Sequence, residues 1–199
     1  FRFNAFTTAT TDTYAIIKGQ ARVVSSVSQT HTEGADTSFS DTNATVSNSY
    51  DSVARITAAA GSSQTAGSDA FRFNAFTTAT TDTYAIIKGQ ARVVRSNSVT
   101  DTTGADTSAS HTEAVVFNQY DSVARLIEEA ANGDRTLGRS VTTGHDAFNF
   151  NTFETVTEDR YSVIKGQSRV AVSHSETDTL GADSSGSHTE AEVVNTYDS

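Results

Sequence analysis

The sequence predicts an all-β fold in which three imperfect repeats stack as parallel layers, as in a β-solenoid or a cross-β structure. An identical segment occurs at 1–24 and at 71–94, and a related segment occupies 148–171. Within each repeat, constant residues alternate with variable ones, and a period of two is the side-chain period of a β-strand. Tandem antiparallel β-hairpin or sandwich domains are the alternative fold.

The clearest alternation lies in the second half of each repeat. The stretch SFSDTNATVSNSY, which begins at Ser38, has counterparts that begin at Ser108 and Ser185. Ser, Ser, Thr, Ala, Val, Asn and Tyr recur at every second position, whereas the residues between them differ. One face of this strand is therefore constant and the other variable. Because burial restricts residue choice, we expect the constant face to lie inside and the variable face outside.

Parallel layers about 4.8 Å apart would place equivalent side chains over one another. Ladders of Asn or Gln, stacked tyrosines and interdigitated Ser and Thr rows stabilise such layers. The predicted self-assembly ladder consists of polar and aromatic residues at equivalent positions of the three repeats. These residues are Ser38, Ser40, Thr42, Asn48, Tyr50, Ser108, Ser110, Thr112, Asn118, Tyr120, Ser185, Ser187, Thr189, Asn195, Tyr197, Gln20, Gln90 and Gln167.

A second alternating stretch precedes the tripeptide Gly-Ala-Asp. In the first repeat it has Ser or Thr at every second position from Ser26 to Thr32. Gly-Ala-Asp between two strands predicts a turn, in which Gly34 is free to take a positive φ and Asp36 bonds to nearby backbone. A chain that folds back at this turn is expected to bring Thr30 near Ser40.

The segment before this stretch is also expected to be extended. Small or aliphatic residues alternate with larger ones from Tyr14 to Val23, and the alternation runs through Lys18 and Gly19. The phenylalanines of FRFNAF, at the start of the repeat, predict a shorter strand. Lys-Gly-Gln does not match a phosphate-binding loop, which needs Gly-x-x-x-x-Gly-Lys-Ser/Thr.

Fixed and variable spacing divide the chain into cores and linkers. Spacing within a core is constant, whereas the segments between the cores differ in length, as loops do. The expected organisation is repeat core 1 at 1–55, linker 1 at 56–70, repeat core 2 at 71–125, linker 2 at 126–147 and repeat core 3 at 148–199.

Linker 2 has a helical alternative. The sequence YDSVARLIEEAANG offers Asp121 or Ser122 as an N-cap and Asn132-Gly133 as a stop signal. A short helix in this linker is therefore one expectation, and an irregular loop is the other.

Composition excludes several classes of function. The net charge of −10 argues against a nucleic-acid binder, which needs a basic surface for the phosphates. The chain has no Cys, so disulfides, thiolate metal sites and Cys nucleophiles are absent. No apolar run approaches the ~20 residues of a membrane-spanning helix. The sequence starts and stops within its own repeat pattern, and we interpret it as a mature or ordered part of a longer protein.

No catalytic, cofactor or metal site is expected. His-Thr-Glu occurs three times, beginning at His31, His111 and His188, and His and Glu two apart on a strand could hold a metal. His31 precedes its Gly-Ala-Asp turn, whereas the other two follow theirs, so these are not equivalent sites. Asp36 in Gly-Ala-Asp lacks the spaced carboxylates of a calcium loop. Threefold repetition further argues against a unique active site, so we expect no enzyme.

The organisation resembles the functional amyloids of bacterial biofilms, such as curli and Fap fibres. The shared features are imperfect repeats, strands rich in Ser, Thr, Asn and Gln, and variable linkers; the repeat motifs of those two families are not present. The resemblance implies an extracellular or cell-surface structural subunit that polymerises end to end with itself and needs no cofactor. A repeat adhesin that binds a matrix glycan or a surface through the variable strand faces is the alternative, and a β-helical enzyme is a third.

Overall fold

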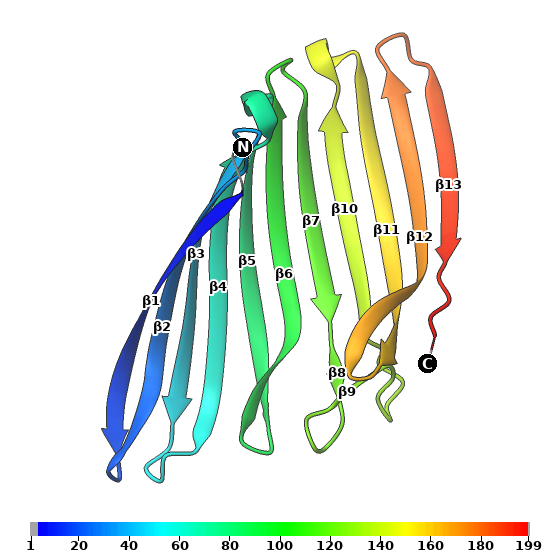
Figure 1. Cartoon of the computed structure of the whole chain (residues 1–199). Coiled ribbons are helices and arrows are strands. Elements are labelled where there is room, and N and C mark those ends of the chain that lie inside the picture. Colours follow the sequence, from blue (N-terminus) through cyan, green and yellow to red (C-terminus); the bar gives the residue numbers. More distant parts are fainter. Residues whose placement is uncertain (1–3, 199) are drawn as a thin grey trace.

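The computed structural model describes residues 4–198, which form one large antiparallel β-sheet that does not close on itself (Figure 1). About 73% of the structure is strand and no α-helix occurs among the described residues. The eleven strands follow one another in sequence order across the sheet, so the topology is a simple meander. In spatial order they are β1 (Ala5–Ile17), β2 (Gln20–Glu33), β3 (Phe39–Tyr50), β4 (Ile56–Ser68), β5 (Asn74–Ile87), β6 (Gln90–Gly104), β7 (Ala109–Phe117), β10 (Leu137–His145), β11 (Asn151–Ile164), β12 (Gln167–Gly181) and β13 (Gly186–Val194).

The all-β prediction is confirmed, but the stacked parallel layers are not what the structure shows. Every pair of neighbouring strands in the sheet is antiparallel, as in the alternative of tandem hairpins. Equivalent strands of successive repeats are four positions apart, as β1 and β5 are, which is about 19 Å at ~4.8 Å per strand. The sequence signals for strands are the same in both arrangements, and the short turns decide between them.

The repeating unit is four strands, because the segments expected to be linkers also enter the sheet. The first unit is β1 to β4, the second is β5, β6, β7 and β10, and the third contributes β11, β12 and β13. Linker 1 is β4, and the end of linker 2 is β10. Two short 3-10 turns, η1 (Ala70–Arg72) and η2 (Ala147–Asn149), join each unit to the next.

The extra length of linker 2 lies in a loop that precedes β10. Here β8 (Gln119–Tyr120) pairs with β9 (Leu126–Ile127), and an isolated bridge joins Glu129 to Arg135. Thr136, which is only 1% exposed, closes this loop. Its hydroxyl donates to the carbonyl of Ile127 at 2.8 Å and accepts from the backbone N–H of Gln119 at 3.0 Å. The helical alternative for this linker is therefore wrong, since these tertiary bonds hold the segment as a hairpin.

Lys18 and Gly19 form a two-residue hairpin loop rather than the middle of a strand. Both residues have positive φ, +48° and +75°, and the same is true of the two equivalent Lys-Gly pairs. Such a loop matches the twist of antiparallel strands, and Gly tolerates the conformation well. The expected strand from Tyr14 to Val23 is therefore two strands, β1 and β2.

The Gly-Ala-Asp turn is confirmed, but its glycine has a different role from the expected one. Thr37, not Gly34, takes the positive φ in this turn. The carboxylate of Asp36 accepts bonds from the backbone N–H of Ser38 at 3.1 Å and from its hydroxyl at 2.6 Å. A Cβ on residue 34 would collide with both of these side chains. Gly34 therefore makes room for the Asp36–Ser38 pair.

The register across this turn differs by two residues from the expected one. Thr30 faces Thr42 rather than Ser40, because the turn closes with a bond from the N–H of Gly34 to the carbonyl of Ser38. A shift of two keeps every side chain on its predicted face. The constant and variable sets thus lie on opposite faces of the sheet, as predicted.

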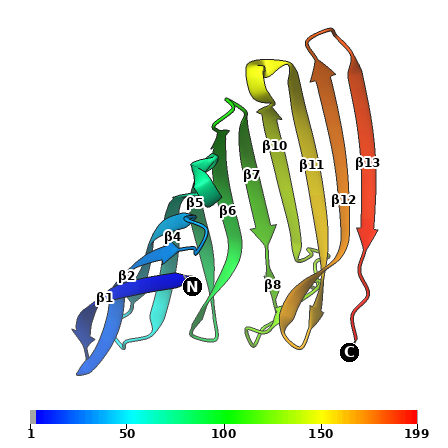
Figure 2. The same ribbon diagram turned by 45° about the horizontal axis from the view of Figure 1, so that its top comes forward.

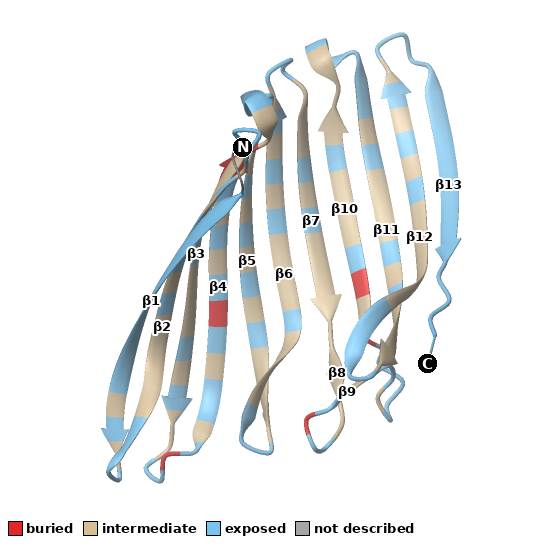
Figure 3. Cartoon of the chain, viewed as in Figure 1, coloured by how far each residue is buried: buried red, intermediate tan, exposed pale blue. Residues whose placement is uncertain are grey.

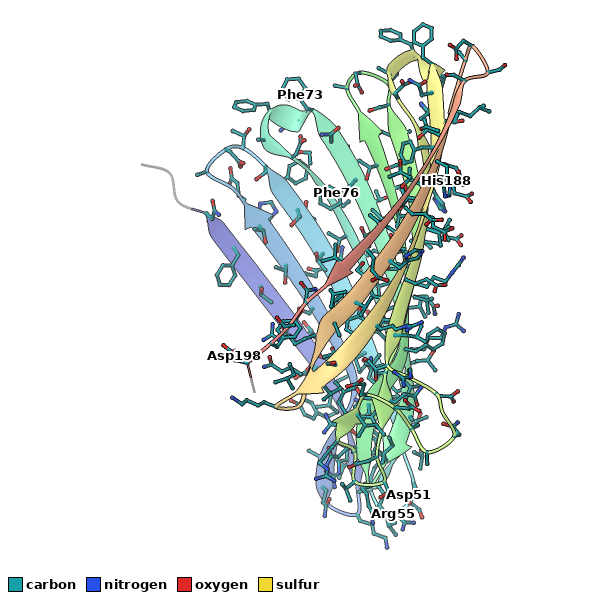
Figure 4. All side chains as sticks on the ribbon, turned by 90° about the vertical axis from the view of Figure 1, so that its right-hand side faces the viewer. Asp51, Arg55, Phe73, Phe76, His188 and Asp198 are labelled. Carbon is teal, nitrogen blue, oxygen red and sulfur yellow. The ribbon has the colours of Figure 1, made fainter. Side chains whose placement is uncertain are left out.

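The constant face does not enclose a dry interior. In the described residues the sheet is a single twisted layer (Figure 2), and side chains extend from both of its faces (Figure 4). Few of residues 4–198 are fully buried, and the buried apolar ones among them are Ala54 and Ala124, in two hairpin turns (Figure 3). In interior strands such as β3 and β7 the constant residues are half-buried, whereas the exposed residues all belong to the variable set, so the constant face is the more buried of the two, as expected. The expected dry interior is not seen, because the constant face of the isolated chain still meets solvent.

Candidate functional site

The constant face carries a continuous row of threonines, one from each strand of the sheet. The register pairs join them in order from the first edge to the last. They are Thr8, Thr30, Thr42, Thr65, Thr78, Thr100, Thr112, Thr142, Thr155, Thr177 and Thr189. Because β4 and β10 contribute to this row, the linkers share the alternating pattern of the cores.

The threonine hydroxyls bond in pairs along this row. Five pairs have oxygen–oxygen distances of 2.9 to 3.0 Å: Thr8–Thr30, Thr42–Thr65, Thr78–Thr100, Thr112–Thr142 and Thr155–Thr177. Within the described residues, no hydrogen bond joins the Thr189 side chain to another group. Thr–Thr pairs across neighbouring strands stabilise antiparallel sheets.

The fourth strand of each unit carries glycines where the next unit begins. In β4, the ring of Tyr84 lies over Gly61 and the ring of Phe76 lies over Gly67. A Cβ on residue 61 would lie 3.0 Å from the Tyr84 hydroxyl, and a Cβ on residue 67 would lie 2.8 Å from the Phe76 ring. In β10, a Cβ on residue 138 would lie 3.0 Å from the hydroxyl of Tyr161, and a Cβ on residue 144 would lie 2.6 Å from the ring of Phe153. The absence of a side chain on the glycine lets an aromatic ring cover the neighbouring backbone.

We call β4 and β10 the connector strands. Both contain the pattern Gly-x-Ser-x-Thr-x-Gly, at 61–67 and 138–144, with the four named residues on the constant face. Sequence reasoning missed this pattern because the two linkers differ in length. The available signal was the distance to the next repeat, since each pattern begins ten residues before the first Phe of that repeat.

The serines and threonines of the predicted ladder lie on the constant face or at its turns. Ser40, Ser110 and Ser187 flank the threonine row, to which Thr42, Thr112 and Thr189 belong. The first serine of each set lies in a Gly-Ala-Asp turn, where its backbone N–H donates to the turn aspartate. These are Ser38, Ser108 and Ser185.

The asparagines and tyrosines bond to the neighbouring strand rather than to one another. The amides of Asn48, Asn118 and Asn195 donate to the carbonyls of Val23, Val93 and Val170, at 3.0 to 3.2 Å. These carbonyls adjoin the β-bulges of the first hairpin in each unit. The hydroxyls of Tyr50 and Tyr197 donate to the first and third of them.

The remaining members of the ladder contact arginines of their own repeat. Gln20, Gln90 and Gln167 each accept a bond from the arginine two residues later, at 2.7 to 2.8 Å. Arg22 and Arg92 also lie over the rings of Tyr50 and Tyr120, each 5.9 Å from the ring centre. Equivalent members are four strands apart, so no Asn, Gln or Tyr ladder forms within the described residues.

The variable face holds three His–Asp pairs, at an equivalent position in each repeat. His31 pairs with Asp41, His111 with Asp101 and His188 with Asp178, each at 2.7 Å. In the first repeat His lies on the strand before the turn and Asp on the strand after it, and in the other two repeats the order is reversed. The three pairs therefore occupy equivalent positions, and His and Asp have exchanged places across the turn in the first repeat relative to the other two.

Two of these histidines have raised pKa values. The bond to Asp101 raises the pKa of His111 above its ordinary value, and Glu113 adds to this effect. For His188 the bond to Asp178 has the largest effect on the pKa, followed by the bond to Glu190. Within residues 4–198, no group of three or more His, Asp or Glu is arranged to hold a metal ion.

The aspartates of the turns are engaged by neighbouring donors. The hydroxyl and then the N–H of Ser38 lower the pKa of Asp36, and Ser108 and Ser185 act in the same way on Asp106 and Asp183. These carboxylates act as turn acceptors, which agrees with the interpretation of Gly-Ala-Asp as a plain turn.

A shallow groove of about 340 Å³ crosses the variable face between the first two His–Asp pairs. Its lining combines small residues such as Ala66 and Ala79 with the amides of Asn43 and Gln64. Asp41 and Asp101, the carboxylates of these two pairs, are among its lining residues.

Both edges of the sheet are open. β1 pairs only with β2, and β13 pairs only with β12, so each has one side without a partner among the described residues (Figure 1). On β1, Phe6 is 78% exposed and Tyr14 is 57% exposed. Unpaired edges of this kind are able to accept another strand.

Comparisons with protein-family models, with curated proteins and with solved structures found no match to this chain. Among the described residues, no helix has the length and hydropathy required to cross a membrane.

Proposed function

We propose that this chain is a self-assembling structural subunit of an extracellular matrix or fibre, of the functional-amyloid or biofilm-matrix type. Copies join through the open sheet edges and extend the sheet in the direction in which the repeats already follow one another. The chain's partner is then another copy of itself, and neither a cofactor nor an enzymatic step is involved.

One observation carries this proposal: each edge strand is equivalent to interior strands that have a second neighbour on the side that is open at the edge. β1 is equivalent to β5 and β11, both of which accept a preceding strand, and β13 is equivalent to β3 and β7, both of which accept a following strand. Natural sheets usually blunt their edges with Pro, short strands or inward charges. This chain has no Pro, and β1 displays two aromatic rings instead.

The assembly test compares two adjacent residues of β1. Phe6 and Thr7 are both exposed but lie on opposite faces. Phe6→Lys removes the ring that is equivalent to Phe76 and adds a charge at the junction, so it should reduce filament formation strongly. Thr7→Lys adds the same charge on the variable face and should assemble like the parent chain. Light scattering and electron microscopy measure both.

Three results would count against this proposal. They are a parent chain that stays monomeric at high concentration, a parent chain without filaments after long incubation, and equal assembly of the two variants. Circular dichroism of both variants checks that the sheet is retained.

The groove on the variable face supports a second candidate, a repeat adhesin that binds a glycan. Carbohydrate hydroxyls are able to bond to amides and carboxylates such as those of Gln64 and Asp101, which line this groove. A glycan array with the parent chain tests this function. Binding that is lost in Gln64→Ala, without filament formation by the parent, would place the adhesin ahead of the fibre.

A further inference from the structure

The connector strands show what kind of strand fits each open edge. β4 lies between β3 and β5, and β10 lies between β7 and β11. The pattern Gly-x-Ser-x-Thr-x-Gly is common to both, although the residues between the named positions differ. A connector strand thus has two sides, one that fits the third strand of a unit and one that fits the first strand of the next.

The side that meets the third strand is recognised through threonine. Thr65 bonds to Thr42 of β3, and Thr142 bonds to Thr112 of β7, both at 2.9 Å. The equivalent residue of β13 is Thr189, at the open edge. A connector strand beside β13 would supply the partner hydroxyl for Thr189.

The side that meets the first strand is recognised through glycine. Gly61 and Gly67 lie beneath Tyr84 and Phe76 of β5. Their equivalents on β1 are Tyr14 and Phe6, the two exposed rings of that edge. A connector strand beside β1 would place a glycine backbone beneath each ring.

Strand direction also favours an additional strand, such as a connector strand, between two copies. In an eleven-strand meander the first and last strands, β1 and β13, run in the same direction. Copies in the same orientation would therefore meet through a parallel pair, which is slightly less stable than an antiparallel pair. One additional strand restores the antiparallel order, as β4 does between β3 and β5.

We propose that each open edge binds an extended segment of the pattern Gly-x-Ser-x-Thr-x-Gly and that such a segment bridges β13 of one copy to β1 of the next. On β13 the Thr of the segment lies opposite Thr189, and on β1 it lies opposite Thr8. This inference rests on the proposed function and names the strand that completes its junction.

Charge favours the connector sequence of β10 over that of β4 at the β13 edge. In β10, Arg139 faces Val115 on one side and lies 3.7 Å from Glu158 on the other. The residue of β13 that is equivalent to Val115 is Glu192. A β10-type segment therefore brings a positive charge to an acidic edge, whereas β4 has Ser62 at that position.

The test uses a synthetic peptide with the sequence of residues 136–147, TLGRSVTTGHDA, and the full chain. We expect saturable binding by fluorescence anisotropy and filament growth that is about tenfold faster than without peptide. A scrambled peptide should do neither. Arg139→Glu in the peptide should weaken binding about 2- to 5-fold, the range of an exposed ion pair.

Register is tested by disulfide formation, which is simple to interpret because the chain has no Cys. Thr189→Cys in the protein should link to a peptide with Thr142→Cys. The same protein should link poorly to a peptide with Ser140→Cys, which belongs opposite Ala191. Equal linking by the two peptides, or no saturable binding at all, would overturn the inference.

A matched peptide separates the two sides of the connector. The three atoms nearest to a Cβ at Gly138 all belong to Tyr161 and Asp159 of β11, so Gly138→Val should spare the β13 side and obstruct the β1 side. This peptide should bind and link to Thr189→Cys but should not accelerate growth. Acceleration equal to that of the parent peptide would contradict the bridging role.

The outcomes also separate this inference from the proposed function. If the peptide links in register but filaments never form, the edge assignment stands and the fibre function fails. If filaments grow at the same rate without binding peptide, the fibre function stands and the connector inference is overturned. A two-fold dimer of β13 edges that the peptide does not dissociate would also overturn the inference.

Discussion

The same sequence occupies two environments in this molecule, at 1–24 and at 71–94. β1 and β5 have the same residues through their shared length, and each forms the same hairpin with the strand that follows. In β5, Phe76 and Tyr84 lie against the glycines of β4, and burial raises the pKa of Tyr84. In β1, the identical Phe6 and Tyr14 are largely exposed. Local sequence sets the strand and its turn, whereas a neighbouring strand sets the burial.

This comparison gives the apolar side chains a different role from that in an ordinary domain. They do not fill a central core, because the sheet is a single layer in the described residues. Instead, they cover the connector-strand glycines at the boundary between one four-strand unit and the next. We call these boundaries joints. The stability of an interior unit therefore depends on the connector strand beside it, which leaves the terminal units with the least support.

The largest effect is expected from filling a glycine at a joint. A Cβ on residue 67 would collide with the carbonyl oxygen of Phe39 and would lie 2.8 Å from the ring of Phe76. Gly67→Ala should therefore cost about 1–3 kcal/mol, as overpacking does. Urea unfolding measures this change.

The control for that substitution is Gly186→Ala. A Cβ at Gly186 meets only the carbonyl of Thr179, at 3.8 Å, and the equivalent residues in the other repeats are Phe39 and Ala109. Unfolding midpoints should be unchanged or slightly higher. Equal losses at the two positions would show that joints are not special.

The next effect compares the two copies of one phenylalanine. Phe76→Ala should lower the free energy of unfolding by about 1–2 kcal/mol, because the ring is partly buried against β4. Phe6→Ala should change it by less than about 0.5 kcal/mol, as exposed substitutions do. Equal losses in monomeric protein would break the comparison between the two environments.

A third prediction concerns acid and the hairpin turns. The backbone N–H of Arg55 is the largest cause of the lowered pKa of Asp51, and Arg125 acts in the same way on Asp121. A carboxyl with a lowered folded-state pKa stabilises the fold above its ordinary value near 4, and this stabilisation is lost as pH falls through the folded-state pKa. The urea midpoint should therefore fall as the pH drops below about 4.

The paired variant Asp51→Asn, Asp121→Asn isolates this contribution. It should be less stable than the parent at pH 6 and should show a smaller further loss in acid. An acid response as steep as that of the parent would assign the effect to other carboxyls.

The smallest effect tests the exchange of His and Asp between repeats. Exchanging Asp101 and His111 should recover the melting temperature that either single substitution lowers, because the first repeat has the exchanged order. The effect is small, since both side chains are about half exposed.

The raised pKa of His111 makes this stabilisation depend on pH. The pair stabilises the fold below pH ~6.5, and this stabilisation is lost as pH rises through the folded-state pKa. A double variant no better than the singles at pH 5.5 would show that the pairing has no role.

The strands and their faces were predictable from the sequence, because a period of two is visible in each repeat. Antiparallel pairing was signalled by Lys18-Gly19, which adopts the positive φ of a two-residue hairpin loop. Linker 1 was not predicted to be a strand, because the difference in length between the two linkers was interpreted as a lack of strand register. The extra residues lie in one loop closed by Thr136, so length says nothing about the connector strand after it.

The candidate site was predictable only in part. The constant face, including Thr42 and Thr112, was recognised from the two strands that flank Gly-Ala-Asp in each repeat, but its continuation through Thr65 and Thr142 requires the fold. The partners of Asn48 and Gln20 depend on a bulge and on a neighbouring arginine. Periodicity alone does not specify such contacts, so the ladder of like residues was the simpler expectation.

Fibre diffraction from assembled protein tests most directly whether four-strand units join edge to edge. Strands that lie across the fibre give a meridional reflection at ~4.8 Å, and the four-strand unit adds a spacing at about 19 Å. We expect both reflections, and we expect Phe6→Lys to give neither because it does not assemble. A ~4.8 Å reflection without the spacing near 19 Å would indicate a like-on-like stack, and protein that remains monomeric would contradict edge-to-edge assembly altogether.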